Sequence, residues 1–423
     1  VCLRSLINQS FNPMSLKPLL PGALNDRGQP LTLGVMGGGQ LGRMFVQAAQ
    51  AMGYFTAVLD PDPASPAGLV SHFHIQTAYD DEQGLAQLMQ RCEAITTEFE
   101  NVPAGALFTL GSHRPVAPAS ACVAVAQDRV REKAHFVRSA PRSGVHPAPY
   151  AAIDTPELLA AAPADVRPGM VWTARLGYVG WGLVGVLDRA VLAAAWEALG
   201  RVPCVLEKRL ALRAECSVIV ARGADGQCVS FPVQKNTHRD GILALTEVYP
   251  GAVDDALAAQ AQRATEAIAA ELNYVGVLCV EFFIVDGANG APTLVVNEMA
   301  PRPHNSGHYT MDACDLTQFE AQVRALAGHP PAPLRQAERA PRPPDGPPPR
   351  DRARRGGGAG HGGPGALAAG PARAGRLSPR GRAPAPPACL QPPPRASSTP
   401  PTRRRPPRPP HRWTRTRTRT RTR

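Results

Sequence analysis

The sequence predicts an α/β domain with a largely parallel sheet, followed by an α+β domain built mainly from short strands. Strand and helix patterns alternate over residues 31–118, short β runs dominate residues 119–330, and apolar periodicity disappears after residue 330. Strands that alternate with helices are typical of a parallel sheet, whereas segregated strands with helices on one side are typical of an α+β fold. A chain of 423 residues has room for two or three such domains.

The individual elements are predicted from apolar runs and from helical periodicity. In the first domain, strands are expected at residues 32–36, 54–60 and 94–97, and a helix at residues 41–52. In the second, strands are expected at residues 150–153, 170–173, 183–187, 204–208, 215–221, 229–233, 277–285 and 292–299. Helices are expected there at residues 119–139, 156–162, 190–199 and 252–272.

The C-terminal stretch, residues 331–423, is predicted to be disordered. Residues 335–423 hold 22 arginines, no lysine and three acids, a formal charge of +19, whereas the rest of the chain carries −7. Runs of Pro, Gly and Thr-Arg cannot bury enough apolar surface to offset the entropy of ordering. Clustered arginine fits a nucleic-acid-binding arm. The same composition fits an out-of-frame translation of GC-rich DNA, which we favour, so nucleic acid is not an expected partner.

The composition favours a reducing cytoplasm over secretion or a membrane. The nine cysteines stand singly, without a C-x-x-C pair, and several lie in apolar runs as small hydrophobes. No apolar run reaches the roughly 18 residues of a membrane span, and the N-terminus lacks a signal pattern. Residues 1–30 are expected to be an N-terminal extension, and because the chain begins with Val1, Met14 is the expected natural start.

A glycine-rich loop at residues 37–42 fits G-x-G-x-x-G between a predicted strand and a predicted helix. Asp60 follows near the end of the next strand, which is the spacing of a dinucleotide site. There, glycines let the backbone approach an anion at a helix N-terminus. A tight turn with nothing bound and a phosphate-bearing ligand at the same helix explain the pattern as well, so three interpretations stay open.

A predicted hairpin places two carboxylates opposite each other. Asn289-Gly290 is a strong two-residue turn signal between the runs 277–285 and 292–299. With that turn, Ala288 faces Ala291, and Glu281 faces Glu298. Facing carboxylates on apolar strands repel unless a cation lies between them, and oxygen ligands are those that Mg²⁺ prefers. The alternative is that both acids point to solvent.

Three polar clusters complete the set of candidates. The loop at residues 300–308, with one arginine and two histidines, suits an anionic substrate. The glycine-rich loop at residues 177–182 either folds over phosphates with its N–H groups or is a plain turn. The role of residues 236–243 is left open by the residues themselves.

These segments, in this order, resemble the ATP-grasp superfamily, and within it the N5-carboxyaminoimidazole ribonucleotide synthetases. The match covers residues 31–329, through segments at residues 37–44, 97–103, 127–129, 173–178, 238–243, 280–283 and 297–310. The last segment is highly specific for this family. The resemblance implies a Rossmann-like pre-ATP-grasp domain at residues 31–118, an ATP-grasp domain at residues 119–330, and the family's C-terminal domain missing.

The resemblance implies a carbon–nitrogen ligase of purine biosynthesis, active in the cytoplasm as a homodimer. ATP and bicarbonate would form carboxyphosphate, whose carboxyl group 5-aminoimidazole ribonucleotide would capture. Glu281 and Glu298 would bind Mg²⁺, or Mn²⁺ in its place, and Glu298 and Arg302 would act in catalysis. The ATP site would comprise Arg129, Trp172, Gly177, Tyr178, Gly180, Gly182, Glu207, Glu215, His238, Asn297 and Glu298. The ribonucleotide would meet Gln40, Glu100, Tyr178, Arg302, His304 and Asn305, which moves the first glycine loop to the substrate side.

The chain departs from the family at the expected phosphate site. Trp172 stands where the family has a lysine, and in the glycine loop Val179, Trp181 and Leu183 replace an aspartate, a lysine and a glutamine. Cations at a triphosphate supply the strong, charge-assisted contacts. The alternative function is therefore a catalytically impaired homologue that binds nucleotide without turnover. An NAD-dependent oxidoreductase using residues 37–42 is a further rival, which the Glu281–Glu298 pair argues against.

Overall fold

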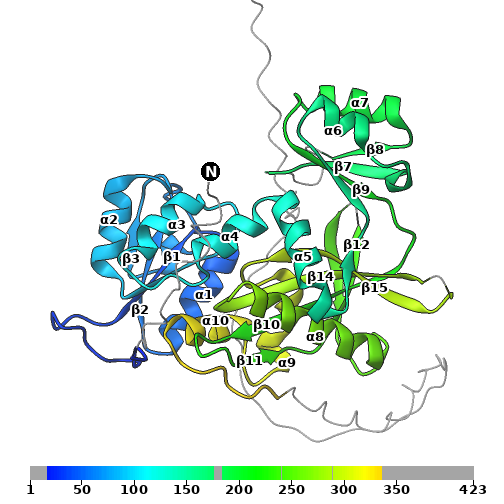
Figure 1. The fold of residues 1–423 in the computed structure, drawn as a ribbon. Helices are drawn as coiled ribbons and strands as arrows, with labels where there is room; N and C mark the ends of the chain where they lie inside the picture. Colours follow the sequence, from blue (N-terminus) through cyan, green and yellow to red (C-terminus); the bar gives the residue numbers. More distant parts are fainter. Residues whose placement is uncertain (1–16, 176–182, 240, 288, 336–423) are drawn as a thin grey trace, which may run out of the picture. The chain divides into compact units, whose positions relative to one another are not determined.

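The computed structural model describes residues 17–175, 183–239, 241–287 and 289–335. Within these residues the strands form three sheets, of four, seven and four strands (Figure 1). The first sheet is parallel and the other two are largely antiparallel, so the predicted sequence of an α/β region and an α+β region is confirmed.

The four-stranded parallel sheet lies near the N-terminus. Its order is β3 (Phe73–Ile75), β2 (Phe55–Leu59), β1 (Thr32–Met36) and β4 (Ala94–Thr97). Every residue of β1 is buried, as expected of a parallel strand that is covered on both faces. The helices of this region are α1 (Gln40–Ala51), α2 (Glu82–Arg91) and α3 (Ala104–Gly111), with a short 3-10 turn, η1 (Gly68–Val70). The prediction missed β3, which is too short to show an alternating pattern.

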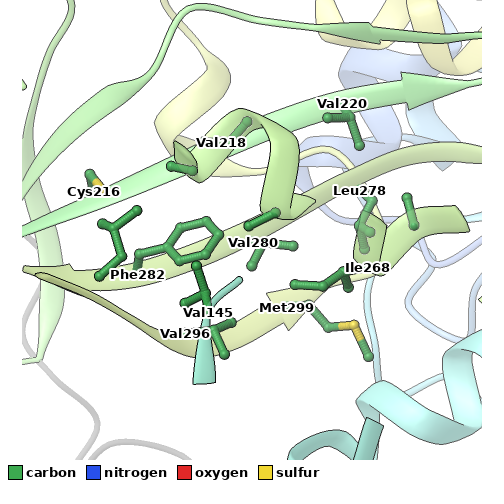
Figure 2. Close-up of a cluster of buried hydrophobic side chains, with 14 of the residues drawn as sticks. Val145, Cys216, Val218, Val220, Ile268, Leu278, Val280, Phe282, Val296 and Met299 are labelled. Atoms are coloured by element: carbon green, nitrogen blue, oxygen red, sulfur yellow. The ribbon is translucent and has the colours of Figure 1, made fainter. Parts of the chain in front are cut away.

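The seven-stranded sheet carries the largest core. Its order is β13 (Ile242–Glu247), β12 (Gln234–Arg239), β10 (Leu212–Arg222), β14 (Gly276–Asp286), β15 (Pro292–Ala300) and β5 (His146–Pro147), with β11 (Cys228–Ser230) paired to β10. Helix α8 (Asp255–Glu271) covers one face, and its Ile268 belongs to the same buried cluster as strand side chains such as Val280 and Phe282 (Figure 2). Full burial of each such side chain contributes about 1.5–3 kcal/mol.

The third sheet is small and has its own core. Its order is β6 (Tyr150–Ile153), β9 (Cys204–Lys208), β7 (Gly169–Thr173) and β8 (Leu183–Val186). Leu192 and Trp196 of α7 (Arg189–Ala198) pack on Val171 and Leu206 of the sheet. The other helices are α4 (Ser120–Ala126), α5 (Arg129–Ser143), α6 (Pro156–Ala161), η2 (Ala164–Val166), η3 (Asn305–Gly307), α9 (Thr310–Ala313) and α10 (Gln318–Leu326).

The single helix predicted at residues 119–139 is wrong, because the chain breaks it at Asp128. This residue has extended backbone, and its Oδ1 accepts hydrogen bonds from the N–H groups of Val130 (3.1 Å) and Arg131 (3.2 Å). Aspartate is a preferred N-cap because its side chain satisfies N–H groups that the first helical turn leaves unpaired. Helix α5 therefore starts afresh at Arg129, and this start sets the position of the Arg129 side chain.

The predicted hairpin register at the two acids is confirmed, but the predicted turn is wrong. Glu281 does face Glu298. However, Asp286 pairs with Pro292, and the N–H of Gly287 donates to the carbonyl of Ala291 (2.7 Å), so the connection is one residue longer than Asn289-Gly290. A β-bulge between Glu281 and Phe282 compensates for the longer turn.

The residue left over at this bulge is Asn297, because Phe282 pairs with Val296 whereas Glu281 pairs with Glu298. Bulges bend a strand locally and turn a side chain away from the regular alternation, often beside a functional site. The bulge therefore gives Asn297 a direction that a regular strand would not allow.

Both ends of the described chain pack on the fold. Leu19 and Ala23, within the predicted N-terminal extension, lie against the first core, and the N–H of Leu19 donates to the carbonyl of Ala327 (2.9 Å). Ala332 and Leu334 pack on the seven-stranded sheet. The predicted start of a disordered tail at residue 331 is therefore too early, while residues 336–423 lie outside the described residues. In the part of the chain that is described, no helix is long and apolar enough to cross a bilayer.

One buried side chain ties the first sheet to the seven-stranded sheet. The Gln322 Oε1 atom of α10 accepts the N–H of Val277 in β14 (2.6 Å), and its Nε2 donates to the Thr96 hydroxyl in β4 (2.8 Å). Gln322 also leaves no room for a Cβ at Gly276, whose φ of +121° requires glycine. Burial of these groups makes each hydrogen bond expensive to lose.

Replacing Gln322 with leucine should lower the free energy of unfolding by about 2 kcal/mol or more, since each stranded buried polar group costs about 1–3 kcal/mol. Urea denaturation followed by circular dichroism measures this loss. The matched control is Gln83→Leu at an exposed position of α2, which should change stability little. Equal stability of the two variants would contradict the bridging role of Gln322.

Candidate active site

Arg129 is the centre of a cluster of charged side chains drawn from three elements. Its Nε donates to Glu207 Oε1 of β9 (2.9 Å), its Nη1 to Glu298 Oε2 of β15 (2.9 Å), and its Nη2 to the bulged Asn297 Oδ1 (3.1 Å). The same Nη1 also reaches Glu132 Oε2 within α5 (3.2 Å). Burial alone would lower the pKa of Arg129, but the surrounding carboxylates, Glu207 foremost, outweigh it and raise that pKa.

Lys133 adds a second cation to this cluster. Its side chain is 0 % exposed, and its Nζ lies 2.7 Å from Glu207 Oε2 and donates to the carbonyl of Asn297 (2.8 Å). Burial opposes ionisation of Glu207, but the positive charges of Lys133 and Arg129 outweigh this effect and lower the pKa of Glu207. Glu132 is bound as well, through the N–H of Met299 (2.7 Å). The cluster thus pairs its buried charges, which the low dielectric of an interior requires.

The two hairpin carboxylates have different partners. Glu298, whose side chain is 48 % exposed, is held by Arg129 as described above. Glu281 is more enclosed, and its Oε1 lies 3.0 Å from His304 Nε2. Burial opposes both charges, yet the pKa of Glu281 is lowered by the His304 hydrogen bond. The pKa of His304 is raised to about 10, because Cys279 and Glu281 outweigh its desolvation.

A chain of hydroxyl and amide groups orients His304 from behind. Its Nδ1 lies 2.9 Å from the Ser306 hydroxyl, which in turn lies 2.9 Å from the Ser217 hydroxyl of β10. Ser217 accepts from Asn236 Nδ2 (2.9 Å) and donates to Gln234 Oε1 (3.0 Å), both in β12. All these partners are buried. Such a network fixes the plane of the imidazole ring and keeps its Nε2 aimed at Glu281.

A second acid–base pair lies on the side of the first sheet. Arg302 Nε donates to Glu100 Oε2 (2.7 Å), joining the loop after β15 to the loop after β4. Gln127 Nε2 donates to the Glu100 carbonyl (2.6 Å), which holds the same loop against α4. Burial opposes ionisation of Glu100, but Arg302 outweighs it and lowers the pKa. The Arg302 guanidinium is thereby held between the loop after β15 and the loop after β4.

The first glycine loop has its N–H groups occupied by the chain's own acids. Gly38 donates to Asp60 Oδ2 (2.7 Å), and Gly39 and Gly42 donate to the two oxygens of Glu98 (2.7 and 2.8 Å). Asp60 Oδ2 also accepts the Tyr79 hydroxyl (2.6 Å), so it is committed within the fold. These contacts favour the tight turn over a dinucleotide site, where an anion of the ligand would take those donors.

Comparison with known proteins shows which family the chain belongs to. Residues 31–127 match the ribonucleotide synthetase preATP-grasp domain, and residues 139–319 match the ATP-grasp domain. The N5-carboxyaminoimidazole ribonucleotide synthase of Brucella melitensis is 42% identical over 303 residues, covering 71% of this chain and 81% of that protein. The chain belongs to the N5-carboxyaminoimidazole ribonucleotide synthase family.

Two solved structures of the family resemble this fold. The Staphylococcus aureus N5-carboxyaminoimidazole synthetase complexed with ADP has a TM-score of 0.66 at 36% identity, covering 75% of this chain and 81% of that chain. The N5-carboxyaminoimidazole synthase from Aspergillus clavatus, in complex with ADP and 5-aminoimidazole ribonucleotide, has a TM-score of 0.62 at 30% identity, covering 71% of this chain and 77% of that chain.

The residues that this family resemblance singled out fall into groups in the structure. Arg129, Glu207, Asn297 and Glu298 lie together around the Arg129 side chain. Trp172 lies beside them, with its ring centroid 5.2 Å from the Arg129 guanidinium carbon. Glu281 and His304 form a second pair, and Glu215 and His238 a third. Arg302 and Glu100 form a fourth, while Gln40 and Asn305 are exposed near helix starts. Gly177, Tyr178, Gly180 and Gly182 lie outside the described residues.

Three site residues were missed by the sequence prediction, and each had a detectable signal. Glu132 and Lys133 share the buried helical face of Phe136, three to four residues away, so charge on that face indicated a polar site. Glu98 follows β4, and the glycine loop follows the neighbouring parallel strand β1. Carboxyl ends of adjacent parallel strands meet at one edge, so contact between the two was to be expected.

Replacing Lys133 with methionine should lower the free energy of unfolding by about 3–5 kcal/mol, because removing one partner of a buried ion pair leaves the other charge uncompensated. Urea denaturation measures this loss. The matched control is Arg142→Met, since Arg142 is 73 % exposed where it pairs with Glu271 (3.4 Å) and an exposed pair contributes about 0–1 kcal/mol. A Lys133 variant as stable as this control would show that the buried pair contributes nothing.

Proposed function

We propose that this protein carboxylates 5-aminoimidazole ribonucleotide with bicarbonate at the expense of ATP, in purine biosynthesis. The observation that carries the proposal is the Arg129 cluster, which joins Glu207, Asn297 and Glu298 in a single charged site. A relative whose structure contains ADP and 5-aminoimidazole ribonucleotide shares the fold. Family membership supplies the reaction class, and the cluster supplies charged groups for the phosphates.

The proposed chemistry has two steps. An oxygen of bicarbonate takes the γ-phosphoryl group of ATP, which gives carboxyphosphate and ADP. The substrate amine then bonds to the carboxyl carbon, the bond from that carbon to the phosphate oxygen breaks, and the amine loses a proton to solvent. Both steps depend mainly on positioning the reactants and on neutralising phosphate charge. Arg129 is the cation of the cluster assigned to this role, while the fully buried Lys133 holds Glu207 in place beside it.

The hairpin acids have the chemistry of a magnesium site. Glu281 and Glu298 face each other across β14 and β15, and Asn297 adds an amide oxygen beside them. Hard oxygen donors of this kind suit Mg²⁺, and Mn²⁺ accepts the same donors. When bound, the ion would neutralise negative charge on the phosphates. Arg129 holds the Glu298 carboxylate and His304 holds the Glu281 carboxylate, so each acid is oriented by its own partner.

The ribonucleotide is assigned to the other side of the site. Arg302 is fixed by Glu100, and its planar guanidinium group pairs well with a phosphate or carboxylate. His304 and Asn305 follow it in the loop, and Gln40 starts α1 on the neighbouring sheet. Tyr178 is assigned here as well, on the family resemblance. Buried free thiols such as Cys92 and Cys204 fit the proposed cytoplasmic location. A homodimer stays a prediction.

Phosphate release from ATP by the full chain, with Mg²⁺ and bicarbonate, should rise when 5-aminoimidazole ribonucleotide is added. Glu298→Gln should lower this stimulated rate by about 100-fold, the order expected when one charge-stabilising group is lost. The control is Glu82→Gln, at an exposed position of α2. Absence of release from a folded protein that still binds ADP would contradict the proposal. It would leave the impaired homologue, with Trp172 in place of the family's lysine, as the better account.

A further inference from the structure

We propose that Cys279, Glu281 and His304 form a binding site for a soft divalent cation such as Zn²⁺. One ligand atom of each residue (a thiol sulfur, a carboxylate oxygen and an imidazole nitrogen) lies within 4.8 Å of the other two. His304 Nε2 and Glu281 Oε1 are 3.0 Å apart. The site goes beyond the proposed reaction. It shares Glu281 with the proposed magnesium site, so the two cations would compete.

The fold brings the three residues together by strand pairing. Cys279 and Glu281 are two positions apart on β14, so their side chains leave the same face of the sheet. Cys279 pairs with Ala300 at the end of β15, and the chain needs only a short loop from there to reach His304. The three ligands therefore come from a rigid hairpin and the loop that directly follows it, and little rearrangement is needed to close them on an ion.

The donor set selects the kind of metal. Sulfur, nitrogen and oxygen ligands are those of Zn²⁺, which in open sites takes three protein ligands and leaves the fourth position to water or substrate. Mg²⁺ prefers oxygen alone and gains nothing from a thiol. Cys279 is completely buried, whereas the Glu281 and His304 side chains are only partly enclosed. An ion can thus approach from the Glu281 side and meet the thiol at the bottom of the site.

The hydrogen-bond partners on the Nδ1 side of His304 can orient its ring for binding a metal at Nε2. Ser217 donates to the Ser306 hydroxyl (2.9 Å), whose oxygen lies 2.9 Å from His304 Nδ1, and the Ser306 backbone N–H donates to the same Nδ1 at 3.3 Å. With an ion on Nε2, the imidazole proton would sit on Nδ1 and be donated to the Ser306 hydroxyl, in place of the longer contact from the Ser306 N–H. Histidine ligands of metals usually donate their other N–H in this manner, which fixes the ring. On binding, the hydrogen bond between His304 and Glu281 is replaced by two bonds to the metal, and the displaced thiol and imidazole protons go to solvent.

Occupation of this site would block the proposed reaction without unfolding the protein. Glu281 would be bound to the soft ion and would no longer be available to Mg²⁺. His304, whose Nε2 already faces Glu281 (3.0 Å), would be bound to the metal and no longer free to contact the ribonucleotide. We therefore expect Zn²⁺ to inhibit in competition with Mg²⁺, while the chain remains folded.

The test is a titration of the full metal-free chain with Co²⁺, which takes zinc sites and absorbs light when bound to thiolate. The wild type should develop a thiolate-to-cobalt absorption band that added Zn²⁺ removes. Cys279→Ser should abolish the band. The matched control is Cys314→Ser, at a half-buried thiol outside the three-residue cluster, which should keep it. Thermal unfolding verifies that each variant is folded.

Two further variants keep the test decisive. Cys279→Ala replaces Cys279→Ser if the serine variant does not fold. Ser306→Ala leaves all three ligands in place and should weaken Zn²⁺ binding by about 10- to 100-fold, the usual effect of removing a group that orients a ligand. A wild type without a thiolate band, or a band that survives in a folded Cys279 variant, would overturn the proposal. Because the band does not depend on turnover, such a failure leaves the proposed carboxylation untouched.

Discussion

The charge of Arg129 is the constraint on which the rest of the site depends. A buried guanidinium has to be paired, and here the partners come from helix α5, from β9 of the small sheet and from β15 of the large one. Local structure positions these groups. The Asp128 cap starts helix α5 at Arg129, and the β-bulge turns the Asn297 side chain toward Arg129. Arg129 and Lys133 both contact Glu207 of the small sheet, and they reach Glu298 and the Asn297 carbonyl of the large one, so the cluster links the two sheets at the site.

The hairpin of β14 and β15 gives the site its chemistry. Its register sets Glu281 against Glu298, and the buried Cys279 lies two residues before Glu281 on the same face of β14. The same carboxylate thus belongs both to the proposed Mg²⁺ site, with Glu298, and to the proposed soft-cation site, with Cys279 and His304. Which ion the protein takes depends on donor chemistry, since oxygen donors alone favour magnesium and an added thiolate favours zinc.

Much of this fold could be predicted from the sequence, because apolar runs report directly on buried strands. Thr32–Met36, Ala94–Thr97, Tyr150–Ile153 and Cys204–Lys208 have the predicted bounds. The break at Asp128 was missed, since an aspartate between two helical patterns reads equally well as an exposed helical residue. The turn length and the bulge were missed because they depend on pairing across strands, and two such errors cancelled at Glu281. Lys133 and Glu98 were missed because apolar periodicity predicts which face of an element is buried, but not which side chains of other elements it will contact.

The most direct test of this account is the affinity of the Arg129→Lys variant for Mg²⁺–ADP, measured by calorimetry beside the wild type. Lysine keeps the charge but cannot bond three separate partners at once, so the geometry of Glu207, Asn297 and Glu298 should be lost. The account predicts a folded variant that binds about tenfold or more weakly, since each charge-assisted hydrogen bond contributes about 1.5–3 kcal/mol. Unchanged affinity in a folded variant would mean that Arg129 does not organise the nucleotide site.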